Sequence, residues 1–404
     1  MNGRPHVVVI NRWQARYAEY ERYLDHDRNA VTYVTTRVGA GPVPDGAAEV
    51  VVVEATDDLA TVAAEVGRLA RRHGAPAGVV ALKEDDLLVA AALREEWGCP
   101  GPTRAELIPF RDKLVMARAV AAAGVAVPAF APAPDVGAVV AFAERHGWPV
   151  VVKPRAGAAS EGVAVASGPE DVELPADAMV QVFDPGRIYH VDGVFDGTGL
   201  AVWRAARYLN TCLAFRSGTT LGAVQEDDPE VLSRVGRFAE RALRALSAKP
   251  VVFHLELFVD AERCAFLEVG ARVGGGEIPF LWREVHGYDL MEAAFRLSLG
   301  QDPPVPPLNR AGGPVAGELL TPAPAQRPCR IVEATPMLGR VPGLYAEVLL
   351  RPGEVLPAAD SYYEHVGGRF RFRGPTSAAV EEAIMTVARG FRVGATALSE
   401  AVAR

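Results

Sequence analysis

Strand-like and helix-like segments alternate along the first part of the chain, and this order constrains the fold more than any other feature. Short apolar runs at 6–10, 50–53 and 78–81 are typical of buried strands. Residues 57–73 and 86–97 have the periodicity and end signals of helices. Because strands that alternate with helices pair in parallel, we expect a parallel α/β domain here. This domain is either scaffold or part of a substrate site.

Composition excludes several classes of protein. The chain has 404 residues, half of them hydrophobic, and a net charge of −8. This much apolar sequence excludes overall disorder, and the acidic balance argues against a nucleic-acid-binding protein. No apolar run reaches the roughly 18 residues of a membrane span, and none is typical of a signal peptide. The four cysteines are far apart, which favours neither zinc nor a redox dithiol. We therefore expect a cytoplasmic protein without a nucleic-acid or membrane partner.

The rest of the chain also mixes helices and strands. A valine-rich strand at 150–154 precedes a loop of small residues at 155–162, and prolines mark a linker at 301–314. Further helices are expected at 111–124, 135–146, 228–246, 289–299 and about 377–389, and strands at 163–165, 252–259 and 264–269.

Two glutamates lie on the neighbouring strands of a predicted hairpin. Residues 252–269 alternate between apolar and polar side chains, and a three-residue loop at 261–263 sets Glu256 directly opposite Glu268. In this alternation Phe266 shares the face of Glu268. Two opposed carboxylates repel each other, so a proton, an arginine or a cation has to compensate.

A metal ion with phosphate is the interpretation that we favour for this pair. Mg²⁺ takes oxygen ligands and usually combines one or two carboxylates with substrate phosphates. Arg272 and the glycines at 274–276 follow Glu268 closely, which suits a phosphate site. The alternative is two solvated glutamates on an outer face of the sheet.

Lysine is rare in this chain, since only four of the 42 basic residues are lysine. Two of these four, Lys113 and Lys153, lie next to segments that suit phosphate binding. Lys153 ends the valine-rich strand before the small-residue loop, whose amides can donate to phosphate. Lys113 lies at the start of a helix. The alternative for each is a lysine that reaches solvent from a strand end or a helix start.

Taken in order, these features resemble the ATP-grasp superfamily, and more narrowly its carboxylate–amine ligases of the L-amino-acid (dipeptide) ligase type. The matching motifs are Arg-Asp-Lys113, Val-Val-Lys-Pro154 with its loop, and Glu256 spaced to Glu268-Val-Gly-Ala-Arg272. They cover the chain to about residue 300. The segment from about residue 311 is similar to the appended lobe of the amino-acid ligases.

The resemblance implies a multi-lobed fold that combines α/β and α+β parts. Residues 1–105 would form a parallel α/β pre-ATP-grasp domain and residues 106–185 the small ATP-grasp lobe with its phosphate loop. Residues 186–310 would form the large lobe with the metal site, and residues 311–404 an appended C-terminal lobe.

The resemblance also implies an enzyme and its chemistry. A carboxylate, such as that of an amino acid, attacks the γ-phosphate of ATP to give an acylphosphate and ADP. An amine then displaces phosphate to form an amide, in peptide or specialised-metabolite biosynthesis. The implied partners are a small-molecule carboxylate and amine, with ATP and one or two Mg²⁺ ions, and the implied assembly is a homodimer. A central-metabolism ligase or carboxylase and a non-catalytic nucleotide-binding module remain alternatives.

Site residues follow from the same resemblance. Glu256 and Glu268 would bind Mg²⁺, and Arg272 with Lys153 would act on the transferring phosphoryl group. The residues expected to hold ATP are Lys113, Lys153, Gly157, Ser160, Gly162, Gln181, Val182, Phe183 and Asp184. The residues expected near the substrates are His254, Arg272, Gly275, Gly276 and Glu277.

Two positions depart from the pattern of many relatives. Gly270 stands where they have asparagine, which leaves a second Mg²⁺ with one protein ligand fewer. Ile188 stands where they have a glutamate for the ribose, so this contact passes to Asp184 or is absent. His190 and Asp192 are expected to make a structural hydrogen bond on a strand. Arg207, Tyr208 and Arg216 lie on a segment expected to cover the amine pocket or to form a solvated face.

Overall fold

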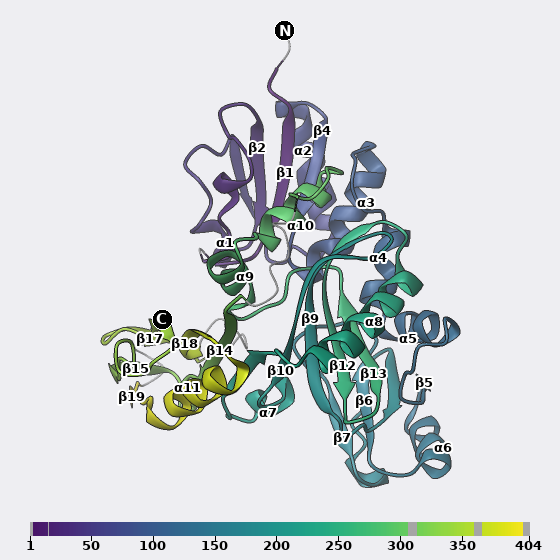
Figure 1. Cartoon of the computed structure of the whole chain (residues 1–404). Coiled ribbons are helices and arrows are strands. Elements are labelled where there is room, and N and C mark those ends of the chain that lie inside the picture. Colours follow the sequence, from purple (N-terminus) through teal and green to yellow (C-terminus); the bar gives the residue numbers. More distant parts are fainter. Residues whose placement is uncertain (1–2, 15, 306–312, 359–365, 399–404) are drawn as a thin grey trace.

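The computed structural model describes residues 3–14, 16–305, 313–358 and 366–398 (Figure 1). The predicted linker at 301–314 lies partly outside these residues. Three regions follow one another along the chain, and Figure 1 shows the N-terminal region at one end of the molecule and the C-terminal region to one side. The predicted mixture of α/β and α+β parts is confirmed.

The N-terminal region is a parallel sheet with the strand order β3-β2-β1-β4. The valines of the inner strands β1 and β2 are buried, and those on one face pack against helices α2 and α3, whereas Val50 and Val52 on the edge strand β3 are exposed. The sequence analysis identified three of the four strands and missed β2. The elements are β1 (His6–Asn11), η1 (Tyr20–Arg22), β2 (Ala30–Thr35), α1 (Arg37–Ala40), β3 (Glu49–Val52), α2 (Leu59–His73), β4 (Pro76–Ala81), η2 (Glu84–Asp86) and α3 (Leu87–Trp97).

A second region is a four-stranded antiparallel sheet with the order β5-β8-β6-β7. The loop of small residues joins β6 to β7, as the sequence predicted. Asp112 caps helix α5 by accepting hydrogen bonds from two backbone amides, so Lys113 is the first residue of this helix. The elements are α4 (Arg104–Arg111), α5 (Lys113–Ala122), β5 (Phe130–Ala133), α6 (Val136–His146), β6 (Val150–Pro154), β7 (Ala164–Ala166), η3 (Pro169–Asp171) and β8 (Ala178–Val182).

The largest element is an eight-stranded antiparallel sheet with the order β13-β12-β9-β10-β11-β14-β18-β16. Helix α8 packs on one face of it, against β10, β13 and β9. The elements are β9 (Arg187–Asp196), β10 (Leu200–Tyr208), α7 (Cys212–Arg216), β11 (Leu221–Gln225), α8 (Pro229–Leu246), β12 (Pro250–Val259), β13 (Cys264–Gly270), α9 (Ile278–His286), α10 (Leu290–Ser298), β14 (Val315–Pro322), β16 (Leu344–Leu349), β18 (Val366–Gly374) and α11 (Ser377–Gly390).

This sheet runs through the predicted boundary at residue 310. Strands β14, β18 and β16 follow that boundary in sequence, yet they continue the sheet that β9 to β13 begin. A further three-stranded sheet is formed by β15 (Cys329–Ala334), β17 (Val355–Leu356) and β19 (Val393–Ala397). The division of the chain into four units stays a prediction.

The hairpin of β12 and β13 differs from the sequence analysis in one respect. Val259 pairs with Cys264, so the loop is one residue longer than predicted. A bulge at Leu267 compensates for this extra residue, and Glu256 therefore lies opposite Glu268 as predicted. The bulge also turns Phe266 into the core beside α8. The prediction that Phe266 shares the face of Glu268 is thus wrong, because strict alternation fails at a bulge.

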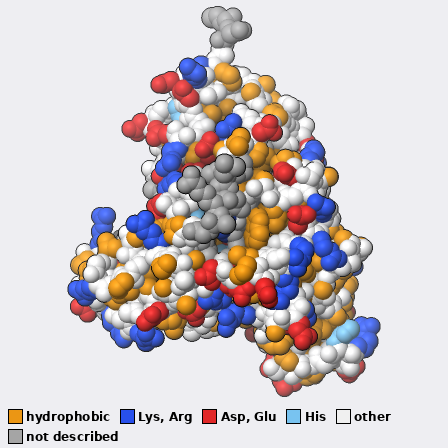
Figure 2. Space-filling model, viewed as in Figure 1, with side chains coloured by type: hydrophobic (Ala, Val, Ile, Leu, Met, Phe, Trp, Pro, Cys, Tyr) orange, Lys and Arg blue, Asp and Glu red, His pale blue; other side chains and the backbone are white. Residues whose placement is uncertain are grey.

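Within the described residues, no helix combines the length and the apolar character that crossing a bilayer demands. On the face of the molecule in Figure 2, basic side chains are interspersed with acidic ones.

Candidate active site

A row of side chains crosses the large sheet at right angles to its strands. Glu268 lies opposite Glu256, and Glu256 lies opposite His190 on the next strand. The row continues through Ala206 to Gln225. Directly opposed residues in antiparallel strands project from the same face, so the two glutamates and the histidine share one surface.

Glu256 is held by two hydrogen-bond donors. The hydroxyl of Tyr208 donates to Glu256 Oε1 at 2.9 Å, and His254 Nε2 lies 3.4 Å from the same oxygen. Burial opposes ionisation of Glu256, but His254 and Tyr208 outweigh it and lower the pKa of this carboxyl group. Glu256 is therefore a fixed carboxylate. The sequence analysis named Tyr208 only as part of a covering segment, since no local pattern shows a tyrosine that bonds a residue 48 positions away.

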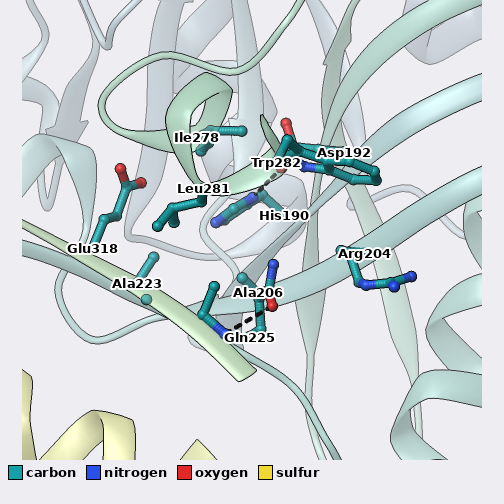
Figure 3. A pocket seen from close by; sticks show the side chains of 12 residues that line it. His190, Asp192, Arg204, Ala206, Ala223, Gln225, Ile278, Leu281, Trp282 and Glu318 are labelled. Atoms are coloured by element: carbon teal, nitrogen blue, oxygen red, sulfur yellow. Dashed lines mark hydrogen bonds and ion pairs between the residues drawn. The ribbon is translucent and has the colours of Figure 1, made fainter. Parts of the chain in front are cut away.

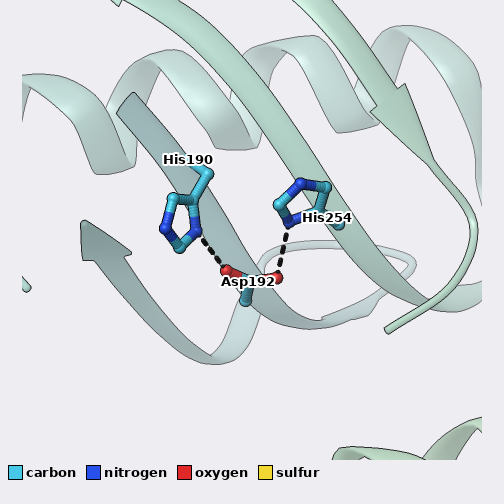
Figure 4. Close-up of side chains that lie close together, drawn as sticks. All are labelled: His190, Asp192 and His254. Atoms are coloured by element: carbon cyan, nitrogen blue, oxygen red, sulfur yellow. Dashed lines mark hydrogen bonds and ion pairs between the residues drawn. The ribbon is translucent and has the colours of Figure 1, made fainter. Parts of the chain in front are cut away.

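Asp192 joins two histidines on this surface (Figure 4). Its Oδ2 atom lies 2.6 Å from His190 Nδ1, and its Oδ1 atom lies 2.8 Å from His254 Nδ1. Burial disfavours a charge on His254, yet the carboxylate of Asp192, with Glu256, raises the pKa of this imidazole to about 10. His254 is therefore a cation between two carboxylates. The predicted structural bond between His190 and Asp192 is present.

Both lysines face this surface. Lys153 is only 3% exposed, and its Nζ donates to Gln181 Oε1 at 2.8 Å. Burial lowers the pKa of Lys153 to about 8, although Glu268 acts in the opposite direction. Lys113 Nζ donates to the carbonyl of Gly157 at 2.9 Å and lies 3.5 Å from Glu268 Oε2. The two predicted lysines therefore lie close to the glutamate pair.

The small-residue loop is linked to two other elements. Besides the bond from Lys113, the guanidinium of Arg216 in α7 donates to the carbonyl of Ala159 at 2.8 Å. Ala159 and Ser160 both have φ of 56°, and Gly157 and Gly162 also have positive φ. This region of φ suits glycine, and it occurs in the turns whose backbone amides bind anions.

The predicted hinge, residues 181–184, is hydrogen-bonded to neighbouring segments. The amide of Val182 donates to the carbonyl of Ala129, and that of Phe183 to the carbonyl of Pro149. The side chain of Phe183 is 40% exposed, whereas Gln181 is buried against Lys153. The carboxylate of Asp184 accepts two hydrogen bonds from Arg263, at 2.8 and 3.1 Å.

Arg272 is bound to the N-terminal region. Its Nε atom donates to Glu84 Oε2 at 2.6 Å, and Arg111 lies 2.7 Å from the other oxygen of Glu84. Burial opposes the charge on Glu84, but Arg272 and Arg111 lower its pKa to about 2. A pocket gathers Lys113, His254, Glu268 and Arg272, all predicted site residues, with Glu84 and Arg111. The sequence analysis missed Glu84, because the ion pair spans 188 residues.

Glu277 lies apart from this pocket. Its carboxylate is fully buried and accepts hydrogen bonds from Arg16 Nη2 at 2.7 and 2.8 Å, with Arg369 and Arg371 at 3.6 and 3.4 Å. The turn before it is tight, since a Cβ at Gly276 would lie 2.8 Å from Glu318 Oε2, whereas one at Gly275 would meet open space. Three arginines thus already neutralise Glu277.

We expect Glu84→Gln to lower the free energy of unfolding by about 3 kcal/mol at neutral pH, because it leaves two buried guanidinium groups beside a neutral amide. The folded-state pKa of Glu84 is below the unfolded value of 4.5, so its contribution is present above pH 4.5 and is lost as the pH falls towards 2. Urea unfolding of wild type and variant at pH 7 and pH 3 measures both effects.

Glu95→Gln is the matched control for this prediction, since Glu95 makes an exposed ion pair with Arg104. It should change stability little. Equal stability of the Glu84 and Glu95 variants would contradict the assignment.

No known protein-family profile matches the chain. Its sequence is 21% identical over 308 residues to an L-arginine-specific L-amino acid ligase of Bacillus subtilis, covering 70% of this chain and 72% of that protein. Its structure superimposes on an L-amino acid ligase from Bacillus licheniformis with a TM-score of 0.76 and 18% identity, over 98% of this chain and 99% of that one. The chain has the ATP-grasp fold.

A second solved structure extends the comparison. The biotin carboxylase domain of the Hydrogenobacter thermophilus 2-oxoglutarate carboxylase shares the ATP-grasp fold, with a TM-score of 0.66 and 15% identity over 96% of this chain and 90% of that one. That structure is a domain dimer in complex with MgADP, ADP and bicarbonate. The resemblance to the ATP-grasp fold, which the sequence motifs indicated, is thus confirmed by the solved structures of a ligase and a carboxylase.

Proposed function

We propose that this protein is an ATP-dependent, ADP-forming carboxylate–amine ligase that activates a carboxylate, such as that of an amino acid, as an acylphosphate. The observation that carries the proposal is the meeting of Glu256 and Glu268 with Lys113 and Lys153 on one surface. Two carboxylates and two ammonium groups are what the charges of a Mg²⁺–triphosphate complex require. The L-amino acid ligase relatives support the choice of substrates.

The donor set suits Mg²⁺. Both glutamates offer oxygen ligands, which this ion prefers, and the cationic His254 keeps Glu256 ionised and oriented. Glu268 is one-third exposed, so its second oxygen faces the pocket and not the core. Gly270 adds no ligand, which leaves two protein carboxylates for one or two ions. When bound, Mg²⁺ would neutralise charge on the phosphate oxygens.

Each protein group has a role in the proposed reaction. Lys153 and Lys113 hold ATP phosphates, and the loop with Gly157, Ser160 and Gly162 covers them; the hinge with Gln181, Val182, Phe183 and Asp184 contacts the nucleoside. Arg272, positioned by Glu84, stabilises charge on the transferring phosphoryl group. A substrate carboxylate oxygen attacks the γ-phosphorus and ADP leaves. The amine nitrogen, after its ammonium form has lost one proton, then attacks the acyl carbon, phosphate leaves, and the nitrogen loses a second proton. His254, Gly275 and Gly276 complete the proposed substrate surroundings, and Glu277 supports them from the core, where arginines bind its carboxylate.

Assembly and organisation are part of the proposal. We propose the four-unit division at residues 105, 185 and 310, with the large sheet shared by the last two units. We also propose a homodimer, since a structural neighbour is a dimer. Light scattering during size-exclusion chromatography gives the mass of the assembly, and a monomer would contradict this part.

Nucleotide product analysis tests the proposed reaction. We expect ADP and phosphate, in equal amounts and dependent on added amino acids, when the protein is incubated with Mg·ATP and an amino-acid pool. Splitting the pool then identifies the carboxylate and the amine. AMP and pyrophosphate would contradict the acylphosphate route. ATP binding without turnover on amino acids, bicarbonate or other carboxylates would favour the alternative of a nucleotide-binding module.

A further inference from the structure

A second pocket lies on the same face of the large sheet, beyond the two glutamates (Figure 3). Its floor is formed by His190, Ala206 and Gln225, which continue the row that begins with Glu268 and Glu256. Because neighbouring strands are about 4.8 Å apart, the floor begins one strand away from Glu256. A molecule in this pocket therefore lies beside the proposed phosphoryl-transfer site.

One polar atom in this pocket has no partner. His190 is 4% exposed, and its Nε2 atom is buried without a hydrogen bond among the described residues. Its Nδ1 atom is 2.6 Å from the Asp192 carboxylate, which accepts a hydrogen bond from it. In the neutral imidazole Nδ1 then carries the hydrogen and Nε2 presents a lone pair. In Figure 3 the ring of His190 lies in the middle of the lining side chains.

A buried lone pair without a donor is costly, so this atom indicates a ligand that supplies a hydrogen. An ammonium group supplies three.

Two carboxyl groups of the lining also favour a positive ligand, whereas Arg204, which lies at the other end of the pocket from Glu318 in Figure 3, donates from its guanidinium to the carbonyl of Trp203 at 2.8 Å. Asp192 and Glu318 line the pocket, and both are buried carboxyl groups. Glu318 accepts a hydrogen bond from the amide of Glu277. Burial, with the nearby Glu277 carboxylate, raises the pKa of Glu318 to about 8, so a cation beside it would be stabilised by its ionisation.

The opposite wall is apolar and close. Three apolar side chains of α9, Ile278, Leu281 and Trp282, face the floor. On the sheet side the small side chains of Ala206 and Ala223 project little into the pocket. This small pocket admits a compact group with an apolar body.

We propose that this pocket binds the amine substrate as a primary ammonium on a compact aliphatic body, with His190 Nε2 accepting its hydrogen bond. The inference rests on the proposed function, because it names the amine site of the same reaction. Asp192 is then a positioning residue, since it fixes the imidazole through Nδ1. The amine lies along the sheet row from the carboxylates of Glu256 and Glu268.

Two substitutions distinguish the roles of the two ring nitrogens of His190. His190→Asn keeps an amide that can donate to Asp192 but removes the acceptor in the pocket, whereas His190→Gln restores an acceptor near the position of Nε2. The probe is n-propylammonium, with propionate as the anion of similar size. We expect wild type to bind propylammonium in a ligand-detected NMR titration and propionate at least tenfold more weakly. His190→Asn should weaken propylammonium binding at least tenfold, His190→Gln less than threefold, and the exposed control His146→Asn not at all.

The same variants are compared in turnover. With Mg·ATP and the amino-acid pool, His190→Asn should raise KM for the amine and leave KM for ATP unchanged, a division that general loss of structure would not give. Propylammonium binding by His190→Asn equal to wild type, or no preference of wild type for propylammonium over propionate, would overturn the proposal. Binding as expected with no amide formed from any amine would leave the pocket proposal standing and overturn the ligase function instead.

Discussion

Replacing Glu268 with glutamine is expected to reduce kcat by at least about 1,000-fold while the fold is retained. The amide has nearly the size of the carboxylate but no charge, and Mg²⁺ prefers charged oxygen ligands. Glu268 is one-third exposed and forms an ion pair with Lys113 at 3.5 Å, so little packing is lost. Amide formation and amino-acid-dependent ADP release measure the rate, and a thermal melt measures the fold.

The control for this variant lies in the same hairpin. Glu262→Gln changes an exposed residue of the loop between β12 and β13 and should keep the wild-type rate. Raising the Mg²⁺ concentration should partly restore the Glu268 variant. Near wild-type amide formation by Glu268→Gln would show that the metal assignment is wrong.

The second large effect is expected at Lys153. Lys153→Arg should lower kcat/KM for ATP by about 100-fold although the charge is kept. The ammonium group is buried between strands and bonded to Gln181 at 2.8 Å, and a larger planar guanidinium cannot take that position. Lys249→Arg is the matched control, because Lys249 is exposed and pairs with Glu106 at the surface. Equal kinetics in the two variants would remove the role assigned to Lys153.

Lys153 also predicts a pH dependence. Burial lowers the pKa of this lysine to about 8, so the free protein loses its positive charge as the pH rises through 8. The affinity of wild type for ATP should therefore fall between pH 7 and pH 9. Arginine stays protonated over this range, so Lys153→Arg should bind ATP weakly but with little change in affinity. Nucleotide titrations at the two pH values measure this difference.

The sequence predicted those parts of the fold that depend on local signals. Asp135 and Asp228 stand at the starts of predicted helices and cap them, and the pairing of Glu256 with Glu268 was correct although the loop length was not. The bulge at Leu267 could not be predicted. A loop of three residues without a bulge and a loop of four residues with a bulge both set Glu256 opposite Glu268, so the sequence does not distinguish the two.

The site was predictable only where its residues lie in recognisable local patterns. Glu268 and Arg272 are four residues apart, and Lys153 directly precedes its loop. The residues that support them lie far away in sequence: Glu84 binds Arg272, and Asp192 orients His254. Such contacts arise when separate regions pack together, so they cannot be predicted from local patterns in a single sequence.

The burial of Glu277 has a consequence for the order in which the chain can complete its structure. Its carboxylate is bound by Arg16 near the N-terminus and by Arg369 and Arg371 on β18, more than 90 residues further along the chain. A chain emerging from the ribosome thus holds this carboxylate with one arginine until β18 has been synthesised. Since a buried charge without its partners is unfavourable, the centre of the molecule becomes stable only once β18 is available to pack there.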